Sequence, residues 1–564
     1  MSRSFSLTVF AVTGAFFAAF FLWPIWEILQ GGLLDADGAL TFAYIVEVFA
    51  NPVYLEGLRN AFFMALFSTL FSFLIAMPLA YLADRFSFPG KALLTALILI
   101  PIILPPFVGA IGVKQMLGQY GAVNAVLTHI GLLTDGETID WLGRGRFWGV
   151  VAMNALHLYP IFFLNLIASL ANVDPAMDEA AENLGCTRFR RFRRITFPLI
   201  RPGLFAGGTI VFIWSFTELG VPLIFDYTRV TSVQIFAGIR DIGANPFPYA
   251  LVIVMLTLTL IFYGLGKGFF GRAHYAMMAK ATTAAETRTL RPIAGWACSA
   301  LFVLVTLVAV LPHIGVVLIS FSQDWYHSVL PKTWTLENYD IALGHSLTVP
   351  SIANSLKYAS LSAVLDVILG VCIAYVVVRT RLPGRHILDS LAMLPLAVPG
   401  IVVAFGYLAM TQEGKFFEFL NPLEDPTILL IIGYAVRRLP FMVRSAAAGF
   451  QQTSEEYEEA ARNLGCPPVK AVFKITLPLI SANIMAGALL CFAFAMLEVS
   501  DSLILAQQQA YYPITKAIYE LFQLMGEGRF VASALGVWAM AFLALTIVGA
   551  GALMGKRFGT IFRF

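Results

Sequence analysis

Long apolar stretches recur along this chain and are separated by short polar segments. Each reaches about 20 residues or more, the length that an α-helix needs to cross the hydrocarbon core of a bilayer. Strict alternation of polar and apolar residues is largely absent, so helices rather than a β-barrel must satisfy the backbone hydrogen bonds in lipid. We therefore predict an all-α integral membrane protein with about twelve transmembrane helices. The spans are expected near residues 5–29, 58–83, 92–118, 147–170, 203–227, 248–270, 293–320, 352–378, 388–411, 428–450, 482–506 and 531–554.

Two of the polar segments are copies of each other. The first contains Glu179, Ala180, Ala181 and Gly185, and the second contains Glu459, Ala460, Ala461 and Gly465. Each residue of the second set lies 280 positions after its counterpart, and the same offset relates Pro198 to Pro478. Further matches, which run from the second span into the third of each half, have an offset of 294. The first copy therefore carries 14 extra residues between its third and fourth spans.

The repeat divides the chain into halves of six spans each. Because six is an even number, the copies are expected to run parallel, related by an axis normal to the membrane. We assign residues 1–270 to a first transmembrane domain, 271–292 to a polar linker and 293–564 to a second transmembrane domain. With the N-terminus inside, the cytoplasmic loops hold 22 Lys and Arg residues and the opposite loops hold 8. Since positive residues gather on the cytoplasmic side, both termini, the linker and both copied segments are predicted to be cytoplasmic.

Composition narrows the possible functions. With 59% hydrophobic and 13% charged residues, the chain is unlike a soluble globular protein. Its five cysteines are scattered, which argues against a disulfide framework or a metal site. No phosphate-binding GxxxxGK[ST] motif is present, because Ile261 stands where the sequence before Gly266 and Lys267 would need a glycine. No His/Asp/Glu set has catalytic spacing, so we expect neither an enzyme nor a bound cofactor.

Local signals predict a helix, a tight turn and a second helix in each copied segment. Asp174 and Pro175 are suited to a helix start, and Thr453 with Glu456 offers a capping box at the matching place. Gly185 and Gly465 fit the left-handed residue that ends a helix. The alanine pair would leave one face flat enough for another surface to approach closely. The alternative is that these are solvated interfacial helices with ordinary caps.

The pattern Glu-Ala-Ala, three residues, Gly, and then Ile-x-x-Pro at 195–198 and 475–478 resembles the coupling loop of binding-protein-dependent ABC importer permeases. The resemblance covers both halves. It implies the type I permease architecture in a bacterial inner membrane, with two cytoplasmic ATPase subunits that hold the ATP and a periplasmic solute-binding protein. In that family the loop helix docks on the ATPase. The contact would be made by Glu179, Ala180, Ala181, Gly185, Glu459, Ala460, Ala461 and Gly465.

Charged residues inside spans are costly, so they are candidates for the translocation pathway. Glu218 and Glu498 are repeat equivalents and would face each other across an axial pore. Asp226 and Asp501 follow them, and the four carboxylates would give the outer pathway a negative field. The alternative is that these acids lie in water at the membrane surface.

Arg437 and Arg438 precede Pro440 in the tenth span, where the first half has His157 and Leu158. The pathway is therefore expected to be asymmetric. One arginine pairing with a carboxylate or carbonyl is the structural interpretation, and contact with an anionic solute is the functional one. Asp366 is a further candidate for buried pairing.

Fused two-copy permeases most resemble those of ferric-iron, thiamine, phosphonate and polyamine importers. The segments 217–222 and 434–440 look like the iron(III) branch, whereas 496–501 departs from it. Ferric iron is thus the expected solute, with phosphonate, polyamine, thiamine or sugar phosphate as alternatives. A hypothesis of another class is a secondary transporter coupled to an ion gradient through Glu218, Glu498 and Asp366. The paired coupling loops distinguish the two, because a secondary transporter has no use for them.

Overall fold

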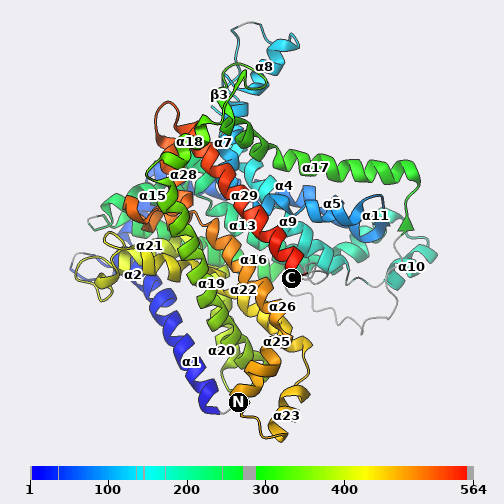
Figure 1. Cartoon of the computed structure of the whole chain (residues 1–564), viewed down its shortest axis with the longest axis vertical. Helices are drawn as coiled ribbons and strands as arrows, with labels where there is room; N and C mark the ends of the chain where they lie inside the picture. The colour runs from blue at the N-terminus through cyan, green and yellow to red at the C-terminus, as the bar shows by residue number, and fades with distance from the viewer. Residues whose placement is uncertain are drawn as a thin grey trace. The chain divides into compact units, whose positions relative to one another are not determined.

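The computed structural model describes residues 3–35, 37–134, 136–143, 146–171, 173, 175–243, 245–270 and 288–554. Most of these residues are helical (Figure 1). Two short sheets complete the described part. β1 (Phe86–Ser87) pairs in parallel with β2 (Arg288–Thr289), and β3 (Ser322–Asp324) pairs antiparallel with β4 (Thr333–Trp334). The prediction of an all-α membrane protein is confirmed.

The chain forms two compact units, and each is described by itself. Unit 1 consists of Met1–Leu55, Thr231–Leu256 and Tyr339–Ile561. Its helices at the N-terminal end are α1 (Arg3–Phe17), η1 (Ala18–Leu22), α2 (Trp23–Leu33) and α3 (Ala43–Ala50), followed by α15 (Thr231–Gly238), η3 (Ile239–Asp241) and the start of α16 (Phe247–Phe270). The later helices are α18 (Glu337–Gly344, most of its length), α19 (Thr348–Arg379), α20 (Arg385–Met393), η4 (Leu394–Leu396), α21 (Gly400–Met410), η5 (Glu418–Leu420), α22 (Thr427–Gln452), α23 (Glu456–Asn463), α24 (Pro468–Ala471), η6 (Val472–Thr476), α25 (Leu477–Leu479), α26 (Ser481–Met496), α27 (Ser500–Leu505), η7 (Gln509–Tyr511), α28 (Ile514–Gln523) and α29 (Gly528–Met554).

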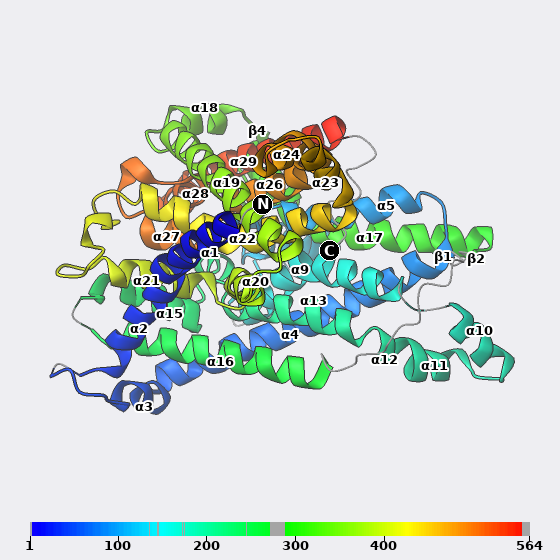
Figure 2. The same cartoon turned by 90° about the horizontal axis from the view of Figure 1, so that it is seen from below.

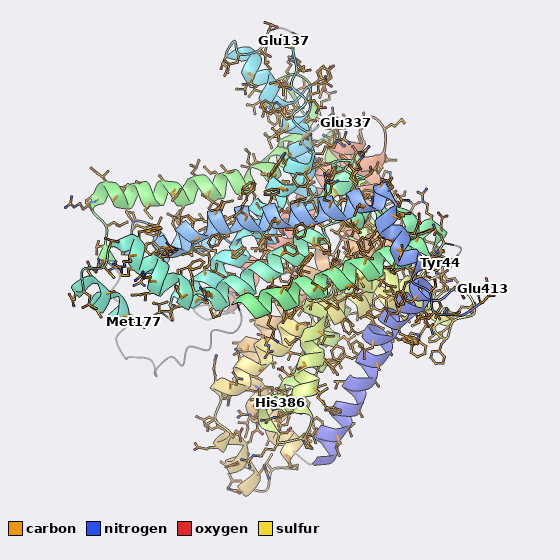
Figure 3. The ribbon with its side chains drawn as sticks, turned by 180° about the vertical axis from the view of Figure 1, so that it is seen from behind. Tyr44, Glu137, Met177, Glu337, His386 and Glu413 are labelled. Carbon is orange, nitrogen blue, oxygen red and sulfur yellow. The ribbon has the colours of Figure 1, made fainter. Side chains whose placement is uncertain are left out.

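Unit 2 consists of Glu56–Val230 and Thr257–Asn338, with three residues at the C-terminal end that lie outside the described part. Its helices are α4 (Pro52–Arg85, most of its length), α5 (Lys91–Leu97), α6 (Ile100–Ile103), α7 (Pro106–Leu117), α8 (Ala122–His129), α9 (Arg146–Leu170), α10 (Pro175–Asn183), α11 (Arg188–Arg191), η2 (Phe192–Thr196), α12 (Phe197–Leu199), α13 (Arg201–Phe216), α14 (Gly220–Ile224), the rest of α16, and α17 (Pro292–Ser320). Figure 2 shows α10 and α11 beyond α12, at one end of α13.

Each unit includes the first span of the other sequence half. In unit 1 the Tyr407 hydroxyl donates a hydrogen bond to the Phe20 carbonyl at 2.7 Å, which ties α21 to the N-terminal span. In unit 2, α17 packs on α7 so closely that a Cβ atom at Gly112 would overlap the Pro312 carbonyl oxygen. Small residues permit such close helix approach in membranes. The predicted linker at 271–292 separates the two sequence repeats, but the compact units do not coincide with those repeats. Residues 271–287 of the linker lie outside the described part.

The described residues contain eight helices that are long and apolar enough to cross a membrane. Three bent helix pairs bring the number to as many as 11: Lys91–Ile103 with Pro106–His129, Arg385–Leu396 with Gly400–Met410, and Pro468–Leu479 with Ser481–Met496. The remaining predicted segment is α22, a continuous helix of 26 residues that is less apolar because it carries Arg437, Arg438 and Arg444. Every predicted span is thus helical.

The third and ninth spans are each a bent pair of helices. Their helix pairs bend by 89° and 100°. The breaks fall at Leu104 and Val398, immediately before Pro105 and Pro399. A proline lacks the amide donor and forces the preceding residue out of the helical region, so the chain turns there.

Candidate functional site

The copied loops have the same backbone geometry in both units. In unit 2, Gly185 follows the end of α10 with φ of 75°, and in unit 1, Gly465 follows the end of α23 with φ of 84°. The Cys186 amide donates to the Ala181 carbonyl at 2.9 Å, and the Cys466 amide donates to Ala461 at 3.0 Å. These bonds, with those from each glycine amide to the residue three before it, form the Schellman motif. The predicted left-handed glycines are confirmed.

The starts of the two loop helices agree only in part with the prediction. Pro175 is the first residue of α10, as predicted, but Asp174 and the side chain of Glu179 lie outside the described residues. The prediction of a capping box in the second loop is wrong. The Thr453 hydroxyl donates to the Gly449 carbonyl instead, and the Glu456 amide donates to Ser454 Oγ at 3.3 Å. Thr453 bonds back to its own preceding helix because α22 continues to Gln452.

Only one alanine of each pair is available to a partner. Ala180 and Ala460 are exposed, whereas Ala181 and Ala461 are buried against their own loops. The most exposed large apolar side chains of the two described loops are Leu184, 85% exposed, and Leu464, 89% exposed. These repeat-equivalent leucines were not among the predicted site residues, although their position directly before each motif glycine was a usable signal. An apolar side chain is thus exposed at the equivalent position of both loops.

The loop side chains are anchored to their own unit by ion pairs. In the first loop Glu182 accepts from Arg191 Nη1 at 2.7 Å and lies 3.5 Å from Arg288. In the second loop Glu458 accepts from the Thr476 hydroxyl at 2.8 Å. The buried Arg379, at the cytoplasmic end predicted for α19, pairs with Glu455 at 3.2 Å. Each loop is therefore held against the ends of its own spans.

The Glu182 ion pair predicts a pH dependence. The hydrogen bond from Arg191, with the charges of Arg191 and Arg288, holds the pKa of the Glu182 carboxyl below its ordinary value of 4.5. Its contribution to loop stability is therefore present above the ordinary pKa and is lost as pH falls through the lowered one. We expect Arg191→Gln to move the Glu182 titration midpoint, followed by carboxyl ¹³C shift, upward towards 4.5. An unchanged midpoint would show that Arg191 does not hold this carboxylate in solution.

A cluster of four charges lies inside unit 1. Arg437 and Arg438 project from α22, while Glu498 and Asp501 lie where α26 ends and α27 begins. Arg437 Nη1 is 2.5 Å from Glu498 Oε1, and Arg438 Nη2 contacts Glu498 Oε2. Arg437 also lies 3.7 Å from Asp501. The expectation that one arginine pairs with a carboxylate is confirmed, and both arginines do so.

Backbone features make room for this cluster. Gly400, the first residue of α21 after the bend, lies so close to Arg437 that a Cβ atom there would overlap the guanidinium group. The Arg438 guanidinium also donates to the Phe494 carbonyl at 2.9 Å. Asp501 is fully buried, and its carboxylate oxygens have no hydrogen-bond partner among the described residues. Three backbone features define this site: the bend in the ninth span, the absence of a side chain at Gly400, and the break between α26 and α27.

The counterpart site in unit 2 has different chemistry. His157 replaces Arg437, and its Nδ1 atom is 2.7 Å from the Pro101 carbonyl oxygen at the bend of the third span. That carbonyl lacks its usual helical donor because residue 105 is proline. Glu218 accepts a hydrogen bond from the Val221 amide at 3.1 Å. Asp226, with φ of 53°, forms an ion pair with Lys114 at 2.6 Å.

The predicted pathway residues thus fall into two groups. Arg437, Glu498 and Asp501 meet in unit 1, and Glu218 and Asp226 belong to unit 2; that Glu218 faces Glu498 across a pore stays a prediction. The expected negative field is not what unit 1 presents, because its two carboxylates lie beside two guanidinium groups and are buried. Asp366 is fully buried and interacts with Cys491 and Arg438, but no described residue donates a hydrogen bond of ordinary geometry to it, so its expected buried pairing stays a prediction.

A bundle of membrane spans with two copied helix–glycine–helix loops and a buried charge cluster defines a multi-span membrane permease. The family described as "Binding-protein-dependent transport system inner membrane component" matches residues 39–273 and 366–554. The chain belongs to this family, in a fused form that carries the family's unit twice. The expected permease class and the internal repeat are confirmed.

Several similar proteins are named as ferric transport permeases, and others as molybdenum or sulfate transport permeases. A Haemophilus influenzae protein named as a ferric transport system permease is 30% identical over 85% of this chain and 75% of its own length. The ferric transport system permease of Actinobacillus pleuropneumoniae is 29% identical over 81% of this chain, and the match spans 64% of that relative, just under two thirds. A solved bacterial ABC transporter involved in alginate import matches 46% of this chain and 95% of its own, with 19% identity and a TM-score of 0.36.

Proposed function

We propose that this permease imports ferric iron in a cycle driven by ATP on separate subunits. It receives the solute from a periplasmic binding protein, and both of its termini are cytoplasmic. The observation that carries the proposal is the pair of loops containing α10 and α23, with the same Schellman turn and an equivalent exposed leucine. Each loop docks one ATPase subunit. Because the two loops are copies, a symmetric pair of ATPase subunits fits them.

Docking is expected to depend on the two exposed leucines. Changing both Leu184 and Leu464 to Ser removes apolar surface that is worth ~25 cal/mol for each Å² a partner buries. We expect the ATPase to be lost or depleted when the variant permease is purified from the native membrane. Leu336→Ser is the matched control, because Leu336 is 65% exposed in a loop before α18. Equal ATPase recovery from the double variant and the control would remove the loops from the interface.

Iron is supported over the other solutes by the assignments of the two relatives. Among the described residues, no group of three or more His, Cys, Asp or Glu side chains is placed to hold a metal ion. Iron would therefore pass through without a resident site, and selection would take place on the binding protein. The two guanidinium groups in unit 1 are paired with carboxylates, so they give no preference for an anion, and a phosphonate or sugar phosphate is the alternative to test.

Uptake into vesicles that contain the full complex and the binding protein tests the solute. We expect ATP-dependent accumulation of radiolabelled ferric iron that excess unlabelled thiamine, polyamine, phosphonate or sugar phosphate does not reduce. Competition by one of these compounds would reassign the solute and leave the importer class intact. Uptake that persists without ATP and collapses with an ion gradient would instead identify the secondary transporter alternative.

A further inference from the structure

Unit 2 contains an apolar groove that the transport cycle described above does not use. It has a volume of about 470 Å³ and lies among α4, α9, α12, α13 and α16. The α4 residues that line the groove recur with helical spacing from Phe62 to Phe73. This part of the helix is about 16 Å long. Half of a typical hydrocarbon core is about 15 Å. The groove is therefore as long as one leaflet of the bilayer is thick.

Aromatic rings close one end of the groove. Phe62, Phe212 and Phe262 contact one another, with ring centroids 5.1 to 6.1 Å apart. At the other end α13 and α16 approach each other, since a Cβ atom at Gly266 would lie 3.1 Å from the Phe205 ring. The groove thus has a closed apolar end and an end near the N-terminus of α13.

Two consecutive glycines of α13, Gly207 and Gly208, shape the floor of the groove, and a Cβ atom at Gly208 would lie 3.3 Å from the Phe162 ring. A Cβ atom at Gly207 would lie 3.0 Å from the Phe162 ring, so Gly207 lets α13 pack on α9. The next residue, Gly208, lines the groove. In the second half the packing glycine recurs as Gly487, but the position of Gly208 is taken by Ala488. The packing requirement is shared by the two halves, whereas the open floor is particular to the first.

Basic residues lie close in sequence to the groove residues at the end near the N-terminus of α13. Arg201 precedes the groove residue Leu204 by one turn of α13, and Lys267 directly follows the groove residue Gly266. Arg193 and Arg194 are exposed one turn before Phe197, which also lines the groove. The second half has Ser481 at the position of Arg201 and Phe473 at that of Arg193. Lys474 matches Arg194, so only the positive charges of Arg193 and Arg201, like the open floor, are particular to the first half.

We propose that this groove binds one acyl chain of an anionic phospholipid, whose headgroup lies among Arg201, Lys267 and the arginines of η2. An apolar slot of leaflet length fits a hydrocarbon chain, and a basic cluster beside membrane helices attracts an anionic headgroup. A neutral phospholipid would gain the same apolar contact without the charge attraction. The site therefore distinguishes phosphatidylglycerol from phosphatidylcholine.

The proposal is tested on the full chain in nanodiscs of equal phosphatidylglycerol and phosphatidylcholine. We expect native mass spectrometry to show a retained phosphatidylglycerol, and a diazirine on its acyl chain to crosslink to peptides of α4 and α13. Gly208→Leu fills the floor and should reduce the crosslink at least fivefold. Gly264→Leu is the matched control, because Gly264 lies on α16 with no atom within 4 Å of an added Cβ.

A charge variant keeps the test valid if Gly208→Leu does not fold. Arg201→Gln with Lys267→Gln leaves the groove walls unchanged and should make phosphatidylcholine crosslink as well as phosphatidylglycerol. The proposal is overturned if the wild-type chain retains both lipids equally. It is also overturned if the crosslink maps away from the groove, or if a co-purifying protein helix occupies the slot instead.

Discussion

Replacing Arg438 with Met is expected to destabilise the protein by ~3–5 kcal/mol, because one partner of a buried ion pair is removed. The Arg438 side chain is 7% exposed and contacts Glu498, which is itself 5% exposed. Arg444→Met is the matched control on the same helix. Arg444 is 55% exposed and pairs with Asp389 at 3.4 Å, so its loss should cost less than ~1 kcal/mol.

Unfolding of the purified chain in detergent measures both variants. The double variant Arg438→Met with Glu498→Gln should be more stable than the sum of the two single changes predicts, because neither charge is then left without its partner. Arg437 retains Asp501 nearby in that background. Equal destabilisation by Arg438→Met and Arg444→Met would contradict the buried cluster and place these charges in water.

Replacing both Gly185 and Gly465 with Val is expected to abolish the stimulation of ATPase activity while membrane insertion is preserved. Both residues have positive φ, where an L-residue with a Cβ atom costs roughly 1–2 kcal/mol and a β-branched one is poorly tolerated. The strain is relieved when the turn opens, which breaks the Schellman bonds and turns Leu184 and Leu464 away from a partner. Neither α10 nor α23 belongs to a candidate membrane span among the described residues.

Two further variants separate loop geometry from general strain. Gly526 has φ of 75° in a turn between α28 and α29, so Gly526→Val imposes the same strain outside the loops and should leave stimulation intact. Asn tolerates the left-handed region, so Gly185→Asn with Gly465→Asn should restore much of the activity. Full stimulation in the double Val variant would show that the loops do not transmit the signal.

Features encoded by neighbouring residues were predictable from the sequence. The apolar stretches gave the spans, because lipid leaves a helix no other way to satisfy its backbone. Gly185 and Gly465 could be placed at positive φ, because a helix end followed by a turn requires it locally. The recurrence of both segments at one offset made the loops a matched pair before any contact was known. Pro101 and Pro105 fit a continuous third span as well as a broken one, because prolines also occur inside continuous transmembrane helices. The bend of the third span therefore could not be predicted from these residues.

Tertiary structure alone decided the arrangement of charges and the grouping of helices. Arg437 and Glu498 are 61 positions apart, and nothing local in the sequence indicates that both carboxylate oxygens of Glu498 are taken by arginines. The contact between Tyr407 and Phe20 spans 387 positions and places the first span with helices of the other half. Whether a side chain is buried, as in Ala181, or projects, as in Leu184, depends on what packs against it. Such contacts are set by long-range packing, whereas periodicity and turn chemistry are set within a few residues.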